Sequence, residues 1–280
     1  MMRTLYALRC LSMAFILSMA SAGRAQAQEA VQEIPYQPEI GQPGKDVVWV
    51  PTSPALVDKM LDLAKVTSRD YVIDLGSGDG RTVIAAAKRG ARALGIEYNP
   101  EMVELSKQNA AKEGIGDKAE FMKADLFETD FSKATVITMF LLPDLNVKLR
   151  PILLKMKPGT RLVSNSFDMG EWEADEIDNL GEGCYAWCTA LLWIVPAMVE
   201  GSWRLDNGEL ALSQKFQMLS GTLTLGGRTL PISGGRMNGD QIRFIADGTT
   251  YTGYLKGNAI EGSAAMGQGK RTWIATRTEN

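Results

Sequence analysis

A hydrophobic strand that runs into a glycine-rich turn is the feature that most limits how this chain folds. Residues 72–81 read Val-Ile-Asp-Leu-Gly-Ser-Gly-Asp-Gly-Arg. Gly76 and Gly78 permit a sharp turn and close approach to a ligand because neither carries a Cβ, and a helix beginning near Gly80 presents free N–H groups. Glu97 lies 21 residues after Gly76, where a second strand ends and its carboxylate can accept hydrogen bonds from ribose hydroxyls. The pattern predicts a nucleotide-binding crossover that holds an adenosyl cofactor.

The side chains around the turn distinguish between two adenosyl cofactors. A dinucleotide fingerprint requires Gly or Ala at position 81, and this chain has Arg81. Asp74 and Asp79 would repel a pyrophosphate but attract the ammonium and sulfonium groups of S-adenosylmethionine (SAM). A third strand ends at Asp125, which would meet the adenine. The sequence therefore predicts SAM, bound by Asp74, Gly76, Ser77, Gly78, Asp79, Glu97, Tyr98, Asp125 and Leu126.

Strands and helices alternate through the first two thirds of the chain. Apolar runs predict strands near 71–75, 92–97, 119–124, 134–140 and 160–166. Helical periodicity predicts helices near 80–89, 101–113 and 144–156, and another that begins at Pro54 after the capping residue Ser53. This alternation predicts an α/β, Rossmann-like domain, a parallel sheet with helices on both faces. The apolar stretch Ala186–Val195 predicts a last, antiparallel strand.

The character of the sequence changes after Gly201. Short alternating segments are separated by dipeptides that suit two-residue hairpin turns, namely Asn207-Gly208, Gly226-Gly227, Gly239-Asp240, Asp247-Gly248 and Gly257-Asn258. We therefore expect a small all-β C-terminal domain, a meander or a barrel, over residues 201–280. Its expected core aromatics are Trp203, Phe216, Phe244, Tyr254 and Trp273.

Residues 46–200 resemble a known enzyme family. The resemblance rests on Val50-Pro-Thr-Ser-Pro54, Asp74-Leu-Gly-Ser-Gly-Asp-Gly-Arg81, Glu97-Tyr-Asn-Pro100, Ala134-Thr-Val-Ile-Thr-Met-Phe-Leu-Leu-Pro143 and Lys157-Pro-Gly-Thr-Arg161. This stretch resembles the class I SAM-dependent lysine methyltransferases related to the mitochondrial ATP synthase c-subunit and adenine nucleotide translocase enzymes, and their exported bacterial relatives. The resemblance implies a seven-stranded methyltransferase sheet and a protein substrate that bears lysine, with a membrane protein as one alternative.

The N-terminus has the pattern of a secretory signal peptide. Residues 1–27 contain three arginines and no acid, then an apolar run over Leu11–Ala22, and end in Ala25-Gln-Ala27. We therefore expect export to a periplasm or the extracellular space, with an uncleaved membrane anchor as the alternative. Residues 28–45 are rich in Gln, Glu, Pro and Gly and are expected to form a flexible lead-in.

Charge and cysteine content exclude several classes of function. Without the leader the chain has 27 Lys and Arg and 33 Asp and Glu, so its net charge is about −6. A nucleic-acid partner is therefore not expected. Cys184 and Cys188 then remain, and we interpret them as small apolar residues packed beside tryptophans, although a turn between them would allow a bridge. With no histidine in the chain, neither a metal site nor a His-based triad is expected.

Direct in-line methyl transfer needs little besides alignment, exclusion of water and a deprotonated nucleophile. The segment after the fourth strand, Thr138-Met-Phe-Leu-Leu-Pro-Asp144, lacks the Asn/Asp-Pro-Pro-Tyr segment that holds planar amines. An apolar channel there would lower the pKa of a lysine ammonium. Asp144 is alternatively a helix N-cap. The catalytic candidates are Phe140, Asp144 and Asn165.

The sequence leaves three functions open. The first is a SAM-dependent methyltransferase that N-methylates lysine in a protein, where the lysine preference is implied by the resemblance alone. The second is a small-molecule methyltransferase. The third is a non-catalytic exported binding protein on a methyltransferase fold, an interpretation favoured by the synthesis of SAM in the cytosol and opposed by the presence of Asp74, Glu97 and Asp125.

Overall fold

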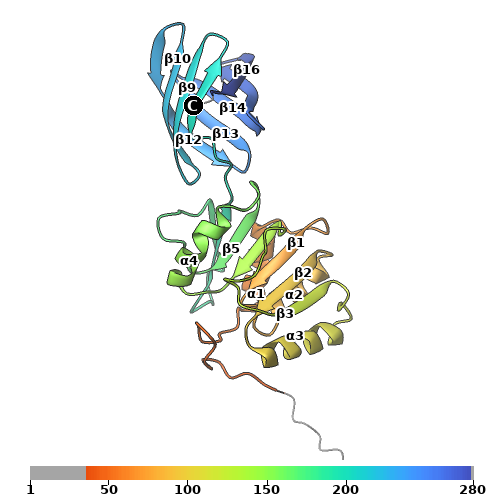
Figure 1. Cartoon of the computed structure of the whole chain (residues 1–280). Coiled ribbons are helices and arrows are strands. Elements are labelled where there is room, and N and C mark those ends of the chain that lie inside the picture. Colours follow the sequence, from red (N-terminus) through yellow and green to blue (C-terminus); the bar gives the residue numbers. More distant parts are fainter. Residues whose placement is uncertain (1–35, 279–280) are drawn as a thin grey trace, which may run out of the picture. The chain divides into compact units, whose positions relative to one another are not determined.

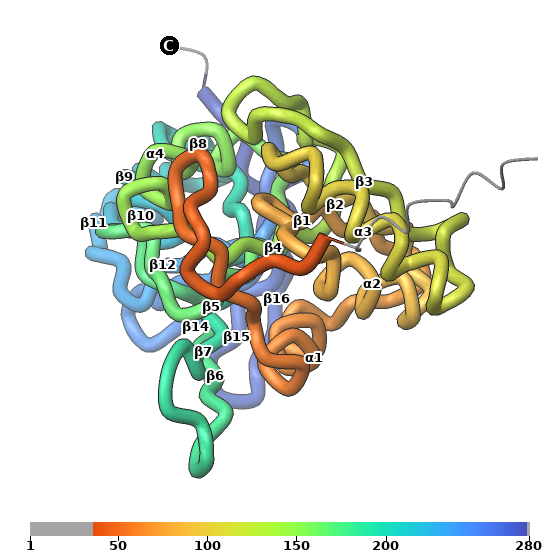
Figure 2. Tube along the Cα trace, turned by 90° about the horizontal axis from the view of Figure 1, so that it is seen from below, coloured from red at the N-terminus to blue at the C-terminus, as the bar shows by residue number. Residues whose placement is uncertain are grey.

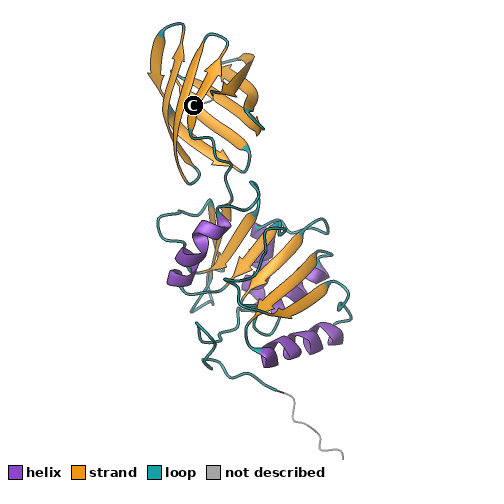
Figure 3. Cartoon of the chain, viewed as in Figure 1, coloured by secondary structure: helices purple, strands orange, loops and turns teal. Residues whose placement is uncertain are grey.

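The computed structural model describes residues 36–278. The predicted leader, residues 1–27, and the first part of the predicted lead-in lie outside the described residues. Two β-sheets follow one another along the chain. Helices occur in the part of the chain that forms the first sheet, and the part that forms the second sheet is all-β (Figures 1 and 3).

The first sheet has seven strands in the order β3-β2-β1-β4-β5-β7-β6. Strands β1 to β5 pair in parallel, β7 is antiparallel to β5, and β6 is antiparallel to β7. The strands are β1 (Tyr71–Leu75), β2 (Arg92–Glu97), β3 (Ala119–Lys123), β4 (Val136–Met139), β5 (Arg161–Asn165), β6 (Glu176–Asn179) and β7 (Thr189–Ile194). The chain order reverses between β1 and β4, where open α/β sheets bind ligands at the carboxyl ends of the strands.

Two hydrophobic layers cover the faces of this sheet. One layer joins α1 (Pro54–Leu63), α2 (Arg81–Lys88) and α3 (Pro100–Lys112) to the sheet, and the other contains Leu149 and Leu153 of α4 (Pro143–Leu153). Ser53 accepts a hydrogen bond from the Leu56 N–H at 3.3 Å and caps α1 as predicted. The expected α/β sheet with helices on both faces is therefore confirmed.

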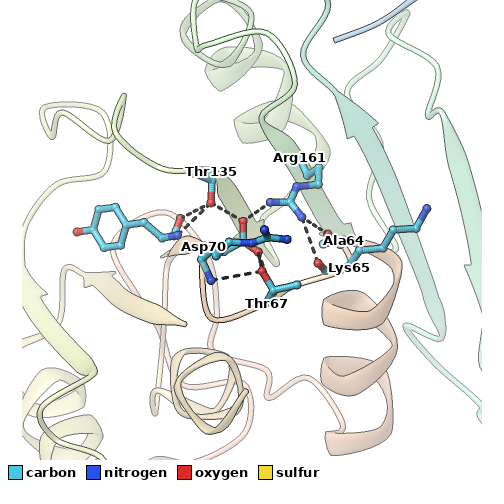
Figure 4. A network of polar contacts seen from close by, with 8 residues as sticks. Ala64, Lys65, Thr67, Asp70, Thr135 and Arg161 are labelled. Carbon is cyan, nitrogen blue, oxygen red and sulfur yellow. Dashed lines mark hydrogen bonds and ion pairs between the residues drawn. The ribbon is translucent and has the colours of Figure 1, made fainter. Parts of the chain in front are cut away.

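A buried acid fastens the amino ends of the parallel strands to α1. The Asp70 carboxylate accepts hydrogen bonds from Thr67 N–H (2.8 Å) and Thr135 Oγ1 (2.8 Å), and pairs with Arg161, whose guanidinium also donates to Ala64 O (Figure 4). Burial raises the pKa of Asp70, but these hydrogen bonds and the Arg161 charge outweigh burial and lower it overall. The network lies at the opposite ends of the strands from the glycine turn, so it supports the sheet without entering the cavity described below.

The second sheet closes into a barrel. Neighbouring strands pair antiparallel, and β9, the last strand of the order, also pairs with β10 near the start of that order, which closes the sheet. Strand β10 pairs with β12 at one end and with β11 at the other, so these two short strands share one edge of β10. The strands are β8 (Gly201–Leu205), β9 (Gly208–Lys215), β10 (Met218–Leu225), β11 (Arg228–Pro231), β12 (Ser233–Asn238), β13 (Gln241–Ala246), β14 (Thr249–Lys256), β15 (Ala259–Met266) and β16 (Gly269–Arg277).

Side chains fill the barrel, and two of its predicted core aromatics are placed differently. Tyr254 is 48% exposed, whereas Tyr251 is buried and stacks on Phe244 with ring centroids 4.8 Å apart. Positions 251 and 254 differ by an odd number, so they face opposite sides of β14. Phe216 lies in the turn between β9 and β10 and stacks on Trp172 instead of entering the barrel core. The sequence prediction was therefore wrong for Tyr254 and Phe216.

Among residues 36–278, no helix has both the length and the apolarity needed to cross a bilayer.

Candidate active site

The glycine turn joins β1 to α2 and leaves no space for side chains. Gly76, Gly78 and Gly80 all have left-handed backbone conformations, with φ of 76°, 54° and 82°. A Cβ on Gly78 would lie 2.7 Å from the Trp49 Nε1, and a Cβ on Gly80 would lie 2.7 Å from the Phe121 ring. Only glycine meets both requirements, so the turn can bring bare backbone against a ligand.

Glu97, at the end of β2, points its carboxylate toward this turn. One carboxylate oxygen accepts a hydrogen bond from the Gly78 N–H and the other from the Asn99 N–H, both at 2.9 Å. Each oxygen retains a further lone pair, and Glu97 is only half-buried and lines a cavity. Its orientation suits a pair of neighbouring hydroxyl groups.

Asp74 is a buried carboxyl at the end of β1. It accepts a hydrogen bond from Thr138 Oγ1 at 2.6 Å, but burial, reinforced by the neighbouring charges of Glu97 and Asp79, raises its pKa to about 7. A carboxyl in this state gains from a nearby positive charge, because a cation offsets both the lost solvation and the repulsion. The site therefore favours a cationic ligand next to Asp74.

Asp79 lines the cavity and also pairs with an arginine of the same turn. Its carboxylate is bound by the Arg81 guanidinium, with Arg81 Nη2 2.6 Å from Oδ2 and Nε 2.9 Å from Oδ1. Arg81 also donates to the Thr52 carbonyl at 2.8 Å. Arg81 thus neutralises Asp79 and ties the glycine turn to the segment before α1.

Residues 41–49 form a hairpin over the same end of the sheet. Gly41 N–H donates to Trp49 O at 2.8 Å and Trp49 N–H donates to Gln42 O at 2.9 Å. At the tip, Lys45 pairs with Asp125 and lies 4.8 Å from the centroid of the Tyr98 ring. The segment that contains it, red in Figure 2, crosses the carboxyl ends of the strands. Residues 41–45, the last part of the predicted lead-in, therefore belong to a hairpin.

The Lys45 contact shifts the pKa of each partner in the direction that favours its charged form. A hydrogen bond from Lys45 lowers the pKa of Asp125, with help from the Phe127 N–H at 2.9 Å, and the same bond raises the pKa of Lys45. Asp125 is thus held as a carboxylate beside the aromatic ring of Tyr98.

These elements enclose a cavity of about 500 Å³. All nine residues assigned to the cofactor from the sequence line it: Asp74, Gly76, Ser77, Gly78, Asp79, Glu97, Tyr98, Asp125 and Leu126. They come from the ends of β1, β2 and β3, which the parallel pairing brings to one edge.

The three catalytic candidates are placed differently from one another. Phe140 follows β4 and lines the cavity. Asn165 is 1% exposed and donates to Thr52 Oγ1 at 3.1 Å, and it is not among the described residues that line the cavity. Asp144 is exposed and is the second residue of α4, and it too lies outside the described lining. The alternative role of Asp144 as N-cap was wrong, because Leu142 occupies that position.

The sequence reasoning missed several residues that line the cavity, among them Lys45, Phe167 and Trp187. Phe167 and Trp187 come from loops that flank β5 and β7, and no local motif marks them. The cysteine interpretation is also corrected. Cys184 and Cys188 form a disulfide, because a turn brings their Cα atoms to 5.9 Å. Their spacing of four was the only available signal.

Comparison with known proteins identifies the domain. A family model described as the ANTKMT methyltransferase domain matches residues 74–176. A protein-lysine N-methyltransferase of Saccharolobus islandicus (strain REY15A) is 44% identical over 140 residues, which are 49% of this chain and 87% of that protein. The chain belongs to the ANTKMT methyltransferase family.

Two further methyltransferases are similar to this chain. The human lysine N-methyltransferase of the ATP synthase c-subunit is 34% identical over 139 residues, covering 49% of this methyltransferase and 59% of the human protein. A crystal structure of an RNA methyltransferase from Salinibacter ruber, in complex with S-adenosyl-L-homocysteine, is 49% identical. That match covers 54% of this chain and 96% of the other, with a TM-score of 0.51.

The cavity of this methyltransferase fits SAM, and the prediction of SAM as cofactor is confirmed. The buried Ser77 Oγ has no hydrogen-bond partner among the described residues, and the glycine cradle would be filled by any Cβ. Glu97 would hold the ribose hydroxyls, Asp125 and Leu126 the adenine, and Asp74 the cationic methionine portion. When bound, SAM supplies a methyl group already activated by its sulfonium. Among the described residues, no group of three or more His, Cys, Asp or Glu is arranged to hold a metal ion.

Proposed function

We propose that this methyltransferase N-methylates lysine side chains in a protein. The observation that carries the proposal is the relationship to the Saccharolobus islandicus protein-lysine N-methyltransferase, which extends over 87% of that protein. The human relative, also named as a lysine N-methyltransferase, supports it.

The residues beside the glycine turn suit an amine nucleophile. Phe140 and Leu141 follow β4 and line the cavity, and they provide apolar walls. Such walls lower the pKa of an incoming ammonium, because burial disfavours its charged form, and they exclude competing water. The incoming ammonium loses its proton to solvent, and the chain then aligns the neutral amine with the methyl group.

The experiment incubates the purified chain with methyl-labelled SAM and a native bacterial protein extract that includes membrane proteins. The expected result is label in protein that appears as N-ε-methyllysine after acid hydrolysis. An extract whose lysines have been acetylated chemically beforehand is the matched control and should take up little label, because an amide nitrogen is not nucleophilic.

An RNA acceptor is the second candidate, because the related Salinibacter ruber protein is named an RNA methyltransferase. The same experiment therefore includes an RNA fraction and a small-molecule fraction. Label in RNA or in small metabolites, with none in lysine, would contradict the proposed function. The net charge of −3 over the whole chain favours a basic protein over RNA.

We also propose that the chain is exported through its N-terminal leader. The Cys184–Cys188 bridge supports this location, because disulfides persist mainly in oxidising compartments. A fusion of residues 1–35 to alkaline phosphatase, which is active only after export, tests the proposal. Phosphatase activity is expected, and its loss when Leu11–Ala22 is deleted is the control. An inactive fusion would contradict export.

A further inference from the structure

Three aromatic rings meet at one side of the cavity, and we call them the aromatic mouth: Phe140, Phe167 and Trp187. The rings of Phe140 and Phe167 are nearly parallel, with centroids 5.8 Å apart and an interplanar angle of 18°. The Trp187 ring meets Phe140 edge-on, with centroids 5.9 Å apart. All three line the cavity that holds the glycine turn, and Trp187 is 46% exposed. The aromatic mouth therefore lies between solvent and the cofactor site.

The backbone holds two of these rings in an unusual way. Ser166, next to Phe167, and Trp187 itself have left-handed conformations, with φ of 59° and 51°. Residues with a Cβ rarely adopt this region, and they do so at sites where the surrounding structure fixes them. Here the Ser166 N–H donates to Thr189 O at 2.7 Å, which continues the pairing of β5 with β7. The antiparallel strands thus bring the Phe167 and Trp187 loops side by side.

The disulfide fixes the Trp187 loop. Cys184 and Cys188 enclose Trp187 in a covalent ring of five residues, and Cys188 directly precedes β7. Cys188 O also accepts a hydrogen bond from the Leu180 N–H at 2.9 Å, so both sides of the loop are tied to the sheet edge. The bridge restricts the backbone around Trp187 to the few conformations that a short covalent ring allows.

The chemistry of the aromatic mouth suits one kind of ligand. Aromatic faces attract cations, the contact strengthens as water is removed, and a flat apolar wall accommodates a methylene chain. The carboxyls of Asp74 and Glu97 line the same cavity and would be taken up by the cofactor, so the aromatic rings are the groups left to attract the acceptor's charge. A neutral acceptor would gain from the apolar walls alone.

We propose that Trp187, positioned by the Cys184–Cys188 bridge, forms with Phe140 and Phe167 the subsite that receives the alkylammonium group of the acceptor. This inference rests on the proposed function and adds to it the residues that recognise the lysine side chain. Trp187 contacts the acceptor, whereas Cys184 and Cys188 are positioning residues.

The test measures binding of n-butylammonium, which has the end of a lysine side chain, to the full chain saturated with S-adenosylhomocysteine. Saturation-transfer NMR gives its dissociation constant, and 1-butanol is the neutral comparison. The expected result is at least tenfold tighter binding of n-butylammonium than of 1-butanol. Equal binding of the two, or no binding of n-butylammonium, would overturn the inference.

Variants assign the effect to Trp187. Trp187→Ala should weaken n-butylammonium binding at least fivefold, and Trp187→Phe should recover most of the loss. Tyr185→Ala is the matched control, because Tyr185 lies in the same five-residue ring and is 99% exposed, and it should bind within twofold of the parent. Binding of S-adenosylhomocysteine should be unchanged in all three, which shows that they fold. Unchanged n-butylammonium binding in Trp187→Ala would overturn the inference.

The bridge is tested by the double variant Cys184→Ser, Cys188→Ser, and by treating the parent with dithiothreitol. In the treatment, the bridge takes up two electrons and two protons to give two thiols, while the dithiol becomes a cyclic disulfide. Both should weaken n-butylammonium binding about threefold without changing S-adenosylhomocysteine binding, since the bridge acts only through the Trp187 loop. No change in either would overturn the positioning role.

The outcomes separate this inference from the proposed function. If labelled lysine appears in the extract experiment but n-butylammonium binds the parent and Trp187→Ala alike, this inference alone fails. If label enters RNA or small molecules only, the proposed function fails, whatever n-butylammonium does.

Discussion

The cofactor side of the cavity is made of short motifs at the ends of three neighbouring parallel strands, whereas the aromatic mouth takes one residue each, Phe140, Phe167 and Trp187, from three separate loops. At the cofactor side, the backbone decides the geometry through glycines with φ of 76°, 54° and 82°. At the aromatic mouth, side chains decide it, and a covalent ring holds one of them. The first arrangement is encoded locally and the second needs the whole sheet.

The difference predicts which changes abolish cofactor binding and which only weaken acceptor binding. Changes in the glycine turn or in Glu97 should act on the affinity for SAM. Changes in the loops around β5 and β7 should act on the acceptor and leave the cofactor bound.

Glu97→Ala should have the largest effect on the affinity for SAM. Glu97 is the residue that would hold the ribose, and its carboxylate also accepts hydrogen bonds from the Gly78 and Asn99 N–H groups. A hydrogen bond to a charged group contributes about 1.5–3 kcal/mol, so loss of two should weaken binding roughly a hundredfold or more. Calorimetric titration measures it. Glu101→Ala, at an exposed position in α3, is the control and should bind normally. A loss below about threefold in Glu97→Ala would contradict the ribose role.

Gly78→Ala should lower both stability and cofactor affinity. A Cβ at φ 54° costs about 1–2 kcal/mol. It would also lie 2.7 Å from Trp49 Nε1 and displace the hairpin. Urea unfolding with and without SAM measures both effects. Gly116→Ala is the control, because nothing lies within 4 Å of a Cβ there. Equal stability of the two variants would show that the turn tolerates side chains.

The affinity for SAM should rise with pH up to about 7. Between its ordinary pKa of 3.8 and about 7, Asp74 keeps its proton in the folded protein but loses it in the unfolded chain. The stability of the fold therefore falls as pH rises through this window. A cation beside Asp74 favours ionisation, so binding releases this proton. Binding at pH 6 should therefore be up to about tenfold weaker than at pH 8. Titrations across pH 5.5–8 check this. Asp74→Asn should flatten the profile, and an unchanged slope in that variant would assign the effect elsewhere.

Lys45→Met should have the smallest effect. Its ion pair with Asp125 lies at the surface, where such pairs contribute little to stability, and the hairpin retains its backbone bonds and the Trp49 contact. The melting temperature, followed by circular dichroism, should stay within about 2 °C of the parent. A much larger drop would mean that the charge, and not Trp49, holds the hairpin.

Local patterns in the sequence predicted much of this molecule. The strands of the first sheet follow their apolar runs closely, and the acidic strand ends Asp74, Glu97 and Asp125 line one cavity because parallel strands end at one edge. The hairpin dipeptides predicted an all-β domain that is either a meander or a barrel, and the structure is a barrel.

The remaining features depend on contacts between distant segments. Strand β6 reads Glu-Ile-Asp-Asn, is exposed and forms only because β7 lies beside it. The hairpin at 41–49 is held by its own backbone hydrogen bonds and by the contact of Trp49 with Gly78, a residue of a distant turn. No pattern in the sequence predicts that Trp187 contacts Phe140.

The most direct test of the account is a calorimetric titration of the full chain with SAM, S-adenosylhomocysteine and NAD in parallel. The acidic turn with Arg81 at position 81 predicts micromolar binding of the first two and none of NAD at the same concentrations. A folded chain that binds neither SAM nor S-adenosylhomocysteine, or that binds NAD as tightly, would contradict the assignment of this cavity.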